Sequence, residues 1–137
     1  MNRADFQKVS RLRVRDARAL LAAGQSAGAY YLIGYAVECA LKACVAKRVR
    51  RYDFPDWDLA KKVYTHNLEG LIGAAVLTKV FNDDKRANKT LELNWAIVKD
   101  WSEASRYDAG WSKAQAEDLY AACTGRNGIL PWIRRRW

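Results

Sequence analysis

Two charged side chains interrupt the most apolar stretch of this sequence. Residues 26–48 form a predicted long helix that is apolar on nearly every face, and Glu38 and Lys42 are its only charges before Lys47. Four residues apart, the two side chains lie on the same helix face in the order that favours an ion pair. They are either such a pair, within the chain or across a dimer interface, or the edge of a polar pocket. Burying ions is costly, so fold stability alone does not require them.

The single histidine of the chain, His66, falls at the expected start of a later helix. There it can cap the helix or bond another one, or it can do acid–base work or contact phosphate. The helix dipole at that position favours a neutral imidazole. Arg106, followed by Tyr107, can bind a carboxylate or phosphate through two parallel hydrogen bonds, or form a tertiary salt bridge. We predict a polar pocket of Glu38, Lys42, His66, Arg106 and Tyr107.

Two basic segments, KRVRR and RRRW, supply a candidate surface for anions. Their basic residues are Lys47, Arg48, Arg50, Arg51, Arg134, Arg135 and Arg136. The chain has 24 basic and 15 acidic residues and a formal net charge of +9, which favours RNA, DNA, nucleotides or an acidic partner. Tyr52, Trp132 and Trp137 are candidates for stacking on bases. A solvated surface with cations at a helix C-terminus explains the same residues equally well.

Most familiar catalytic signatures are absent from the sequence. It has no Walker A loop, no GxGxxG, no HExxH and no GxSxG. Cys39, Cys44 and Cys123 form no CxxC pair, so we expect small buried hydrophobes in a reducing cytoplasm, with no metal and no cofactor. The first residues lack the pattern of a signal peptide, and polar residues interrupt the uncharged run 19–37. We therefore expect a cytoplasmic protein without a membrane span.

The elements that position these residues are predicted to be helical. The length of 137 residues, half of them hydrophobic, suggests a single domain over 1–137. No segment alternates as a half-buried strand does. We predict an all-α, up-and-down bundle of about five helices, two of them long core helices. They are expected at about 4–23, 26–48, 66–77, 90–104 and from 112 onward. Residues 52–65 are expected as a loop with a short turn or helix, and residues 78–89 as a loop or a frayed helix start.

Local signals mark three of the helix boundaries. Gly24 can close the first helix in the left-handed conformation. Ser112 and Gln115 form a capping-box pair that starts the last helix. Pro131 either kinks this last helix or begins a new turn after the Asn127-Gly128 pair.

Several segments, taken in order, resemble the HEPN family of small helical domains. DARALLAAGQSAGAYYLIGYAVECALKA resembles the family's first two helices with their Glu-x-x-x-Lys, and THNLEGLI resembles its Thr-His-x-Leu-x-x-Leu element. SRYD resembles the Arg-Tyr after the fourth helix, and AQAEDLYAACTGRNGILPWI resembles the closing helix. The resemblance implies a bundle that forms a symmetric homodimer in prokaryotic toxin–antitoxin, defence or stress modules, often beside a minimal nucleotidyltransferase.

The resemblance also implies a chemistry that this sequence does not fully carry. Active members of the family are metal-independent ribonucleases that use an arginine followed four to six residues later by a histidine. Neither Arg106 nor Arg126 is followed by such a histidine. We therefore expect a non-catalytic HEPN-like homodimer that binds a nucleotide, RNA or a nucleotidyltransferase partner through a basic surface. The alternative is a metal-independent endoribonuclease with a non-standard site of His66 and Arg106. A DNA-binding regulator is a third class, which no helix-turn-helix pattern supports.

Overall fold

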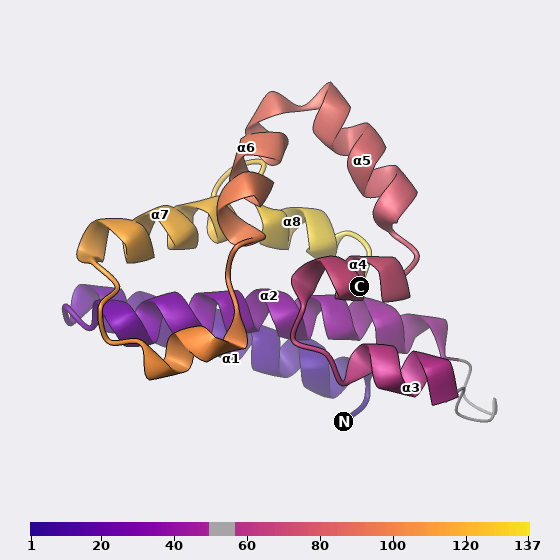
Figure 1. The fold of residues 1–137 in the computed structure, drawn as a ribbon, viewed down its shortest axis with the longest axis horizontal. Helices are drawn as coiled ribbons and strands as arrows, with labels where there is room; N and C mark the ends of the chain where they lie inside the picture. The colour runs from indigo at the N-terminus through magenta and orange to yellow at the C-terminus, as the bar shows by residue number, and fades with distance from the viewer. Residues whose placement is uncertain (50–56) are drawn as a thin grey trace.

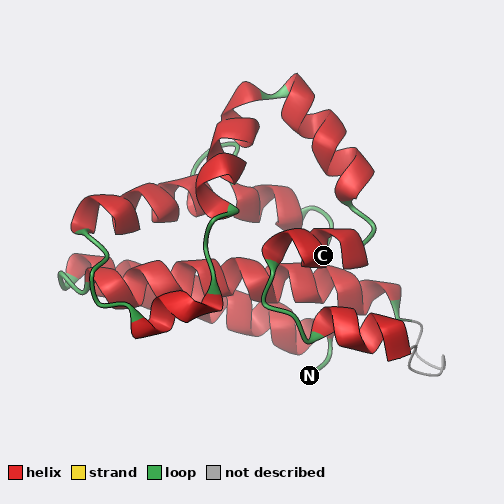
Figure 2. Cartoon of the chain, in the orientation of Figure 1, coloured by secondary structure: helices red, strands yellow, loops and turns green. Residues whose placement is uncertain are grey.

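The computed structural model describes residues 1–49 and 57–137, which form helices joined by short loops, without a strand among them (Figures 1 and 2). In chain order the α-helices are α1 (Arg3–Ala22), α2 (Ser26–Arg48), α3 (Trp57–Val63), α4 (Leu68–Ala74), α5 (Thr78–Ala87), α6 (Lys89–Val98), α7 (Lys113–Thr124) and α8 (Ile129–Arg134). A 3₁₀ helix, η1 (Glu103–Tyr107), precedes α7. The all-α prediction is confirmed. The described residues hold more helices than the predicted number of about five, because α3, α5 and α8 are each separate helices.

The two longest helices, α1 and α2, form an antiparallel hairpin around a tight turn (Figure 1). Gly24 adopts a φ of 76°, and its backbone N–H donates to the carbonyl of Leu21 at 3.1 Å. The N–H of Gln25 donates to the carbonyl of Leu20 at 2.8 Å, which completes the C-terminal cap. The predicted role of Gly24 is confirmed, and α2 has the predicted bounds.

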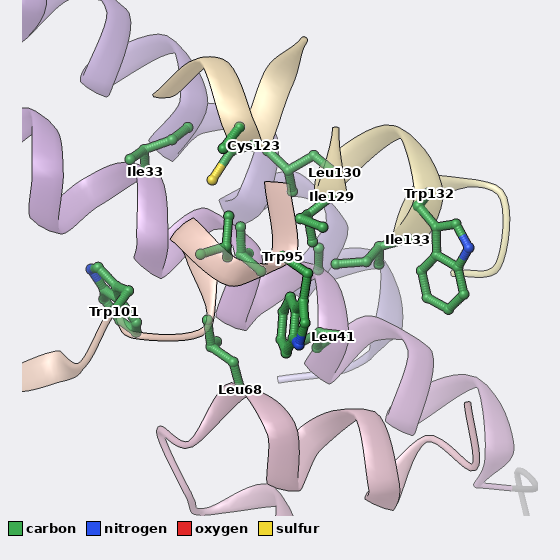
Figure 3. Close-up of a cluster of buried hydrophobic side chains, with 14 of the residues drawn as sticks. Ile33, Leu41, Leu68, Trp95, Trp101, Cys123, Ile129, Leu130, Trp132 and Ile133 are labelled. Carbon is green, nitrogen blue, oxygen red and sulfur yellow. The ribbon is translucent and has the colours of Figure 1, made fainter. Parts of the chain in front are cut away.

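Helix α2 lies at the centre of the molecule, as its apolar sequence predicts. It packs against α1, α4, α7, α8 and η1. Its length and composition would also suit a membrane-crossing helix, but 72% of its apolar window is buried inside the protein. Ile33 and Leu41 of α2 lie in one buried cluster with Trp95 of α6, Ile133 of α8 and Trp101 from the segment after α6 (Figure 3).

Residues 78–87, expected as a loop or a frayed helix start, form the complete helix α5. Helices α5 and α6 form an inverted V above α2, with its apex pointing away from α2 (Figure 1). Phe81 anchors α5, because its buried ring packs on Trp95 at 5.0 Å and on Trp132 at 4.5 Å between ring centroids. Asp84 accepts hydrogen bonds from Trp132 Nε1 at 2.8 Å and from Arg136 Nη2 at 2.9 Å. One aromatic and one acidic side chain thus hold a mostly polar helix on α8.

Helix α6 ends at Val98, earlier than the expected boundary near 104, and Trp101 then turns back into the core. The capping box of Ser112 and Gln115 starts α7 as predicted, with hydrogen bonds of 2.9 and 3.1 Å. Beyond α7 the chain turns at Asn127, whose φ is 58°. Pro131 lies in the first turn of the separate helix α8, where it needs no N–H partner. Of the two alternatives at Pro131, the new helix is the one observed.

Candidate functional site

A fully buried carboxylate, Glu38, is the centre of a polar cluster on α2. Its Oε1 accepts a hydrogen bond from Lys42 Nζ at 2.8 Å, which is the predicted pair one helical turn apart. The same oxygen is 2.9 Å from Nδ1 of His66. The side chain of Glu38 is only 1% exposed, and its Oε2 has no hydrogen-bond partner among the described residues. The pair is therefore internal to the chain, and it ties α2 to the segment before α4.

His66 is held in place by the turn that starts α4. This helix begins at Leu68, two residues later than expected. Asn67 is its N-cap and accepts from the backbone N–H of Gly70 at 2.8 Å. The hydroxyl of Thr65 accepts from the N–H of Asn67 at 3.1 Å. This rigid turn points the imidazole at α2 from outside the helix, so His66 does not cap α4.

Glu103 of η1 extends the polar cluster to Arg106. Its Oε2 is 2.9 Å from Nε2 of His66, and its Oε1 is 2.8 Å from Nη2 of Arg106. The polar cluster is thus a series of five alternating groups: Lys42, Glu38, His66, Glu103 and Arg106. Glu103 is not among the residues predicted for the pocket, although its spacing of three residues from Arg106 is a signal for an ion pair within one helical turn.

The two carboxylates that flank His66 determine which form of the imidazole fits. An ionised carboxylate accepts hydrogen bonds and donates none, so both ring nitrogens must carry a proton to bond Glu38 and Glu103. The imidazolium therefore satisfies both contacts, whereas a neutral ring leaves one nitrogen facing an oxygen without a proton between them.

His66 also borders a cavity that opens to solvent. The cavity has a volume of about 390 Å³ and is lined by Thr65, His66, Lys99, Trp101 and Glu103, among others. The side chain of His66 is 44% exposed. Part of the imidazole ring therefore remains accessible to a small molecule or a backbone phosphate, although both ring nitrogens contact carboxylates.

Tyr107 does not join this cavity. Its side chain is exposed, and the guanidinium of Arg106 lies 4.8 Å from the centroid of its ring. Arg106 and Tyr107 line a separate cavity of about 180 Å³ together with Tyr31 and Asp108. Of the predicted pocket residues, Lys42 and His66 thus both contact Glu38. Arg106 is linked to them only through Glu103, and Tyr107 contacts Arg106 but not the rest of the cluster.

The chemistry open to the polar cluster is limited by its hydrogen bonds. A general base needs an unprotonated nitrogen, and both nitrogens of His66 face carboxylates. Arg106 forms an ion pair with Glu103. Within residues 1–49 and 57–137, no group of three or more His, Cys, Asp or Glu side chains is placed to hold a metal ion. The most direct role of the polar cluster is to join α2, the α4 turn and η1.

Lys47 of the first predicted basic segment contacts the second one, which also meets α1. Lys47 Nζ donates to the backbone carbonyl of Arg136 at 3.3 Å. The guanidinium groups of Arg11 and Arg134 lie 4.8 and 5.7 Å from the ring centroid of Trp137. Burial, and then the nearby charge of Arg11, lower the pKa of Arg134. We name this region the basic surface, and its described members are Arg11, Lys47, Arg48, Arg134, Arg135 and Arg136.

Parts of the predicted basic surface need correction or lie elsewhere. Trp132 is 2% exposed and packs in the core, so the expectation that it stacks on bases is wrong. Trp137 is half-buried and remains available beside its two arginines. Arg50, Arg51 and Tyr52 lie outside the described residues.

The fold and these two regions define the class as a small all-α protein with a buried ionic cluster and a basic end. No protein-family model, no curated protein and no solved structure matches the chain.

Proposed function

We propose that this protein is a non-catalytic, HEPN-like homodimeric module of a prokaryotic toxin–antitoxin, defence or stress system. In this proposal it binds RNA or a nucleotide through the basic surface, and a minimal nucleotidyltransferase is its candidate protein partner. The ordered resemblance of four segments supports the family, and the helical fold is compatible with it. The net charge of +9 supports a polyanionic ligand.

The observation that carries this proposal is the gathering of separate cations around Trp137. Arg11 and Arg134 come from α1 and α8, yet both guanidinium groups lie against one indole ring. Lys47 joins them through the carbonyl of Arg136. Like charges repel when they are held together, and a phosphate chain would relieve that repulsion while it releases its own counterions. The half-buried ring adds a surface on which a base can stack.

The proposal is tested by the affinity for a labelled single-stranded RNA, measured by fluorescence anisotropy. We expect binding that weakens steeply between about 50 mM and about 200 mM salt. The variant Arg11→Gln/Arg134→Gln should weaken binding at least about tenfold, because two phosphate contacts are lost. The control Arg18→Gln/Lys113→Gln removes the same charge from the other end of α1 and from the start of α7. Equal losses in both variants, or no binding at low salt, would refute the role of the basic surface.

The homodimer is tested separately, by mass measurement in solution. We expect twice the chain mass at micromolar concentration. A protein that stays monomeric at micromolar concentration would refute the dimer and leave the RNA measurement unaffected.

One observation favours the ribonuclease alternative. His66 and Arg106 bond the same carboxylate of Glu103, and His66 borders an open cavity. In that step the ribose 2′-hydroxyl would attack the phosphate held by Arg106 and lose its proton to water. His66, as an imidazolium, would protonate the 5′ oxygen as its bond to phosphorus breaks, without a metal. Incubation with labelled RNA in EDTA separates the two hypotheses. Cleavage that is lost in both His66→Ala and Arg106→Ala would replace the binding proposal with the enzymatic one.

A further inference from the structure

A third hollow lies between α6 and α7, apart from the polar cluster and the basic surface. It has a volume of about 460 Å³, and its apolar lining comes from Tyr30, Ile97, Trp111 and Leu119, with Ala96. Tyr30 and Trp111 stack with 3.8 Å between ring centroids and 8° between planes. Two parallel aromatic rings therefore give the hollow a rigid apolar wall. We name it the α6/α7 groove.

Helix α6 continues this apolar lining onto the surface. Its core side is formed by Leu91, Trp95 and Val98, all of which are buried. Leu93 and Ile97, four residues apart, face outward and are 55% and 45% exposed. Two large aliphatic side chains on one outward face, beside a groove with aromatic lining, form a contiguous apolar patch rather than scattered exposed residues.

The charge of the α6/α7 groove is opposite to that of the chain. Asp100 and Asp118 line it, and no lysine or arginine is among its described lining residues. Neither carboxylate takes part in an ion pair within the described parts of the chain. Burial, and then the charge of Asp100, raise the pKa of Tyr30, so its hydroxyl stays a hydrogen-bond donor. In a chain of net charge +9, a groove with two free carboxylates repels phosphates and attracts cations.

We propose that the α6/α7 groove docks an amphipathic helix of a partner protein. Its apolar side chains, spaced three and four residues apart, fill the groove between Ile97 and Trp111, and its lysine or arginine side chains pair with Asp100 and Asp118. Two helices form the walls, so the groove offers side chains rather than a strand edge, which suits a helix and not an added strand. The protein then carries two binding surfaces of opposite charge, one for a polyanion and one for a basic helix.

The test uses a helical peptide of about 16 residues with leucines at helical spacing and lysines on the flanks of that stripe. A twin peptide carries glutamate in place of every lysine. Binding is followed by the indole N–H resonance of Trp111, assigned with Trp111→Phe. We expect saturable binding of the basic peptide alone, although the chain itself is basic. No saturable shift, or equal binding of the acidic twin, would overturn the proposal.

Matched variants locate the contact. Ile97→Lys should weaken binding of the basic peptide at least about tenfold, whereas Val80→Lys, the same change at an exposed position of α5, should leave it unchanged. Asp100→Asn/Asp118→Asn should weaken binding and reduce its salt dependence, whereas Glu69→Gln/Asp83→Asn should do neither. Equal effects of target and control variants would overturn the proposal. So would a wild-type dimer that Ile97→Lys converts to monomer, because a second copy would then occupy the groove.

Discussion

The indole ring of Trp101 lies directly against the Cα of Gly34, so closely that a Cβ at this position would overlap Trp101 Nε1, Cε2 and Cδ1. Glycine is needed here for space and not for its backbone freedom, since Gly34 lies in the middle of α2. The contact brings the chain after α6 onto the central helix and sets where η1, with Glu103, begins. The absence of a side chain at Gly34 thus helps to determine where Glu103 and Arg106 of the polar cluster lie.

Gly34→Ala should therefore destabilise the fold, although alanine is the better helix former. We expect a loss of about 1–3 kcal/mol in the free energy of unfolding, because Trp101 or η1 must move to admit the methyl group. Gly73→Ala is the control, since nothing lies closer than 3.9 Å to the added Cβ. Urea unfolding followed by circular dichroism measures both variants. If Gly34→Ala left the free energy of unfolding unchanged, Trp101 would be able to move away without cost.

Lys42→Met should cost about 3–5 kcal/mol, because it leaves the buried charge of Glu38 with a single partner. The control is Lys79→Met in α5, where Lys79 and Asp83 have the same spacing at 3.5 Å but are exposed. That pair should be worth less than about 1 kcal/mol. Thermal and urea unfolding of the two variants give the comparison. Equal losses would mean that burial of Glu38 does not strengthen the pair.

Asp84→Ala should release α5 from α8. Asp84 bonds both Trp132 and Arg136, and removing it leaves the indole N–H of a buried ring without an acceptor. A loss of about 1–3 kcal/mol is expected for that group. Asp83→Ala, the neighbouring residue with exposed ion pairs of 3.5 Å, should change stability by less than about 0.5 kcal/mol. Hydrogen exchange of the α5 amides would show the release directly.

The buried cysteines should make stability fall at alkaline pH. Burial raises the pKa of the Cys39 and Cys44 thiols to about 11, and it also raises the pKa of Cys123. In the unfolded chain a thiol ionises near about 8.5. Between these values the native state keeps protons that the unfolded state has lost, so the free energy of unfolding decreases as pH rises.

The measurement is the urea midpoint at about pH 8, where both states are mostly protonated, and at about pH 10. Wild-type protein should lose more stability over this interval than Cys39→Ala/Cys44→Ala. Parallel decreases in the two proteins would assign the effect to lysines or tyrosines instead.

The parts of the fold that the sequence predicted are those with a strong local signal. Three such features are the apolar run of α2, the glycine turn after α1 and the capping box of Ser112. Each depends only on residues that are close together in the sequence, so each can be predicted from it. Helix α5 was missed because its only buried side chain is Phe81, whose partners Trp95 and Trp132 lie far along the chain. The polar and apolar residues of α5 do separate onto different faces, but its apolar face is too small to stand out in a mostly polar segment.

The polar cluster was half predictable for a similar reason. Glu38 and Lys42 can be recognised from the sequence, because they are charged residues in an otherwise apolar helix. Glu103 is one exposed-looking acid among several, and its role depends on how Trp101 places η1 on α2. Trp132 shows the opposite error: it stands between basic residues in the sequence, yet Asp84 accepts its indole N–H and the core buries its ring.

The burial of most of α2 has a consequence for the exchange of its amides with solvent. Its backbone amides between Ala29 and Val45 are covered by five other elements, so no single helix can leave and expose them all. Amides of this kind exchange only when the whole protein opens. Their slowest rates should give the global free energy of unfolding without denaturant, and each substitution above should accelerate them in step with its loss of stability.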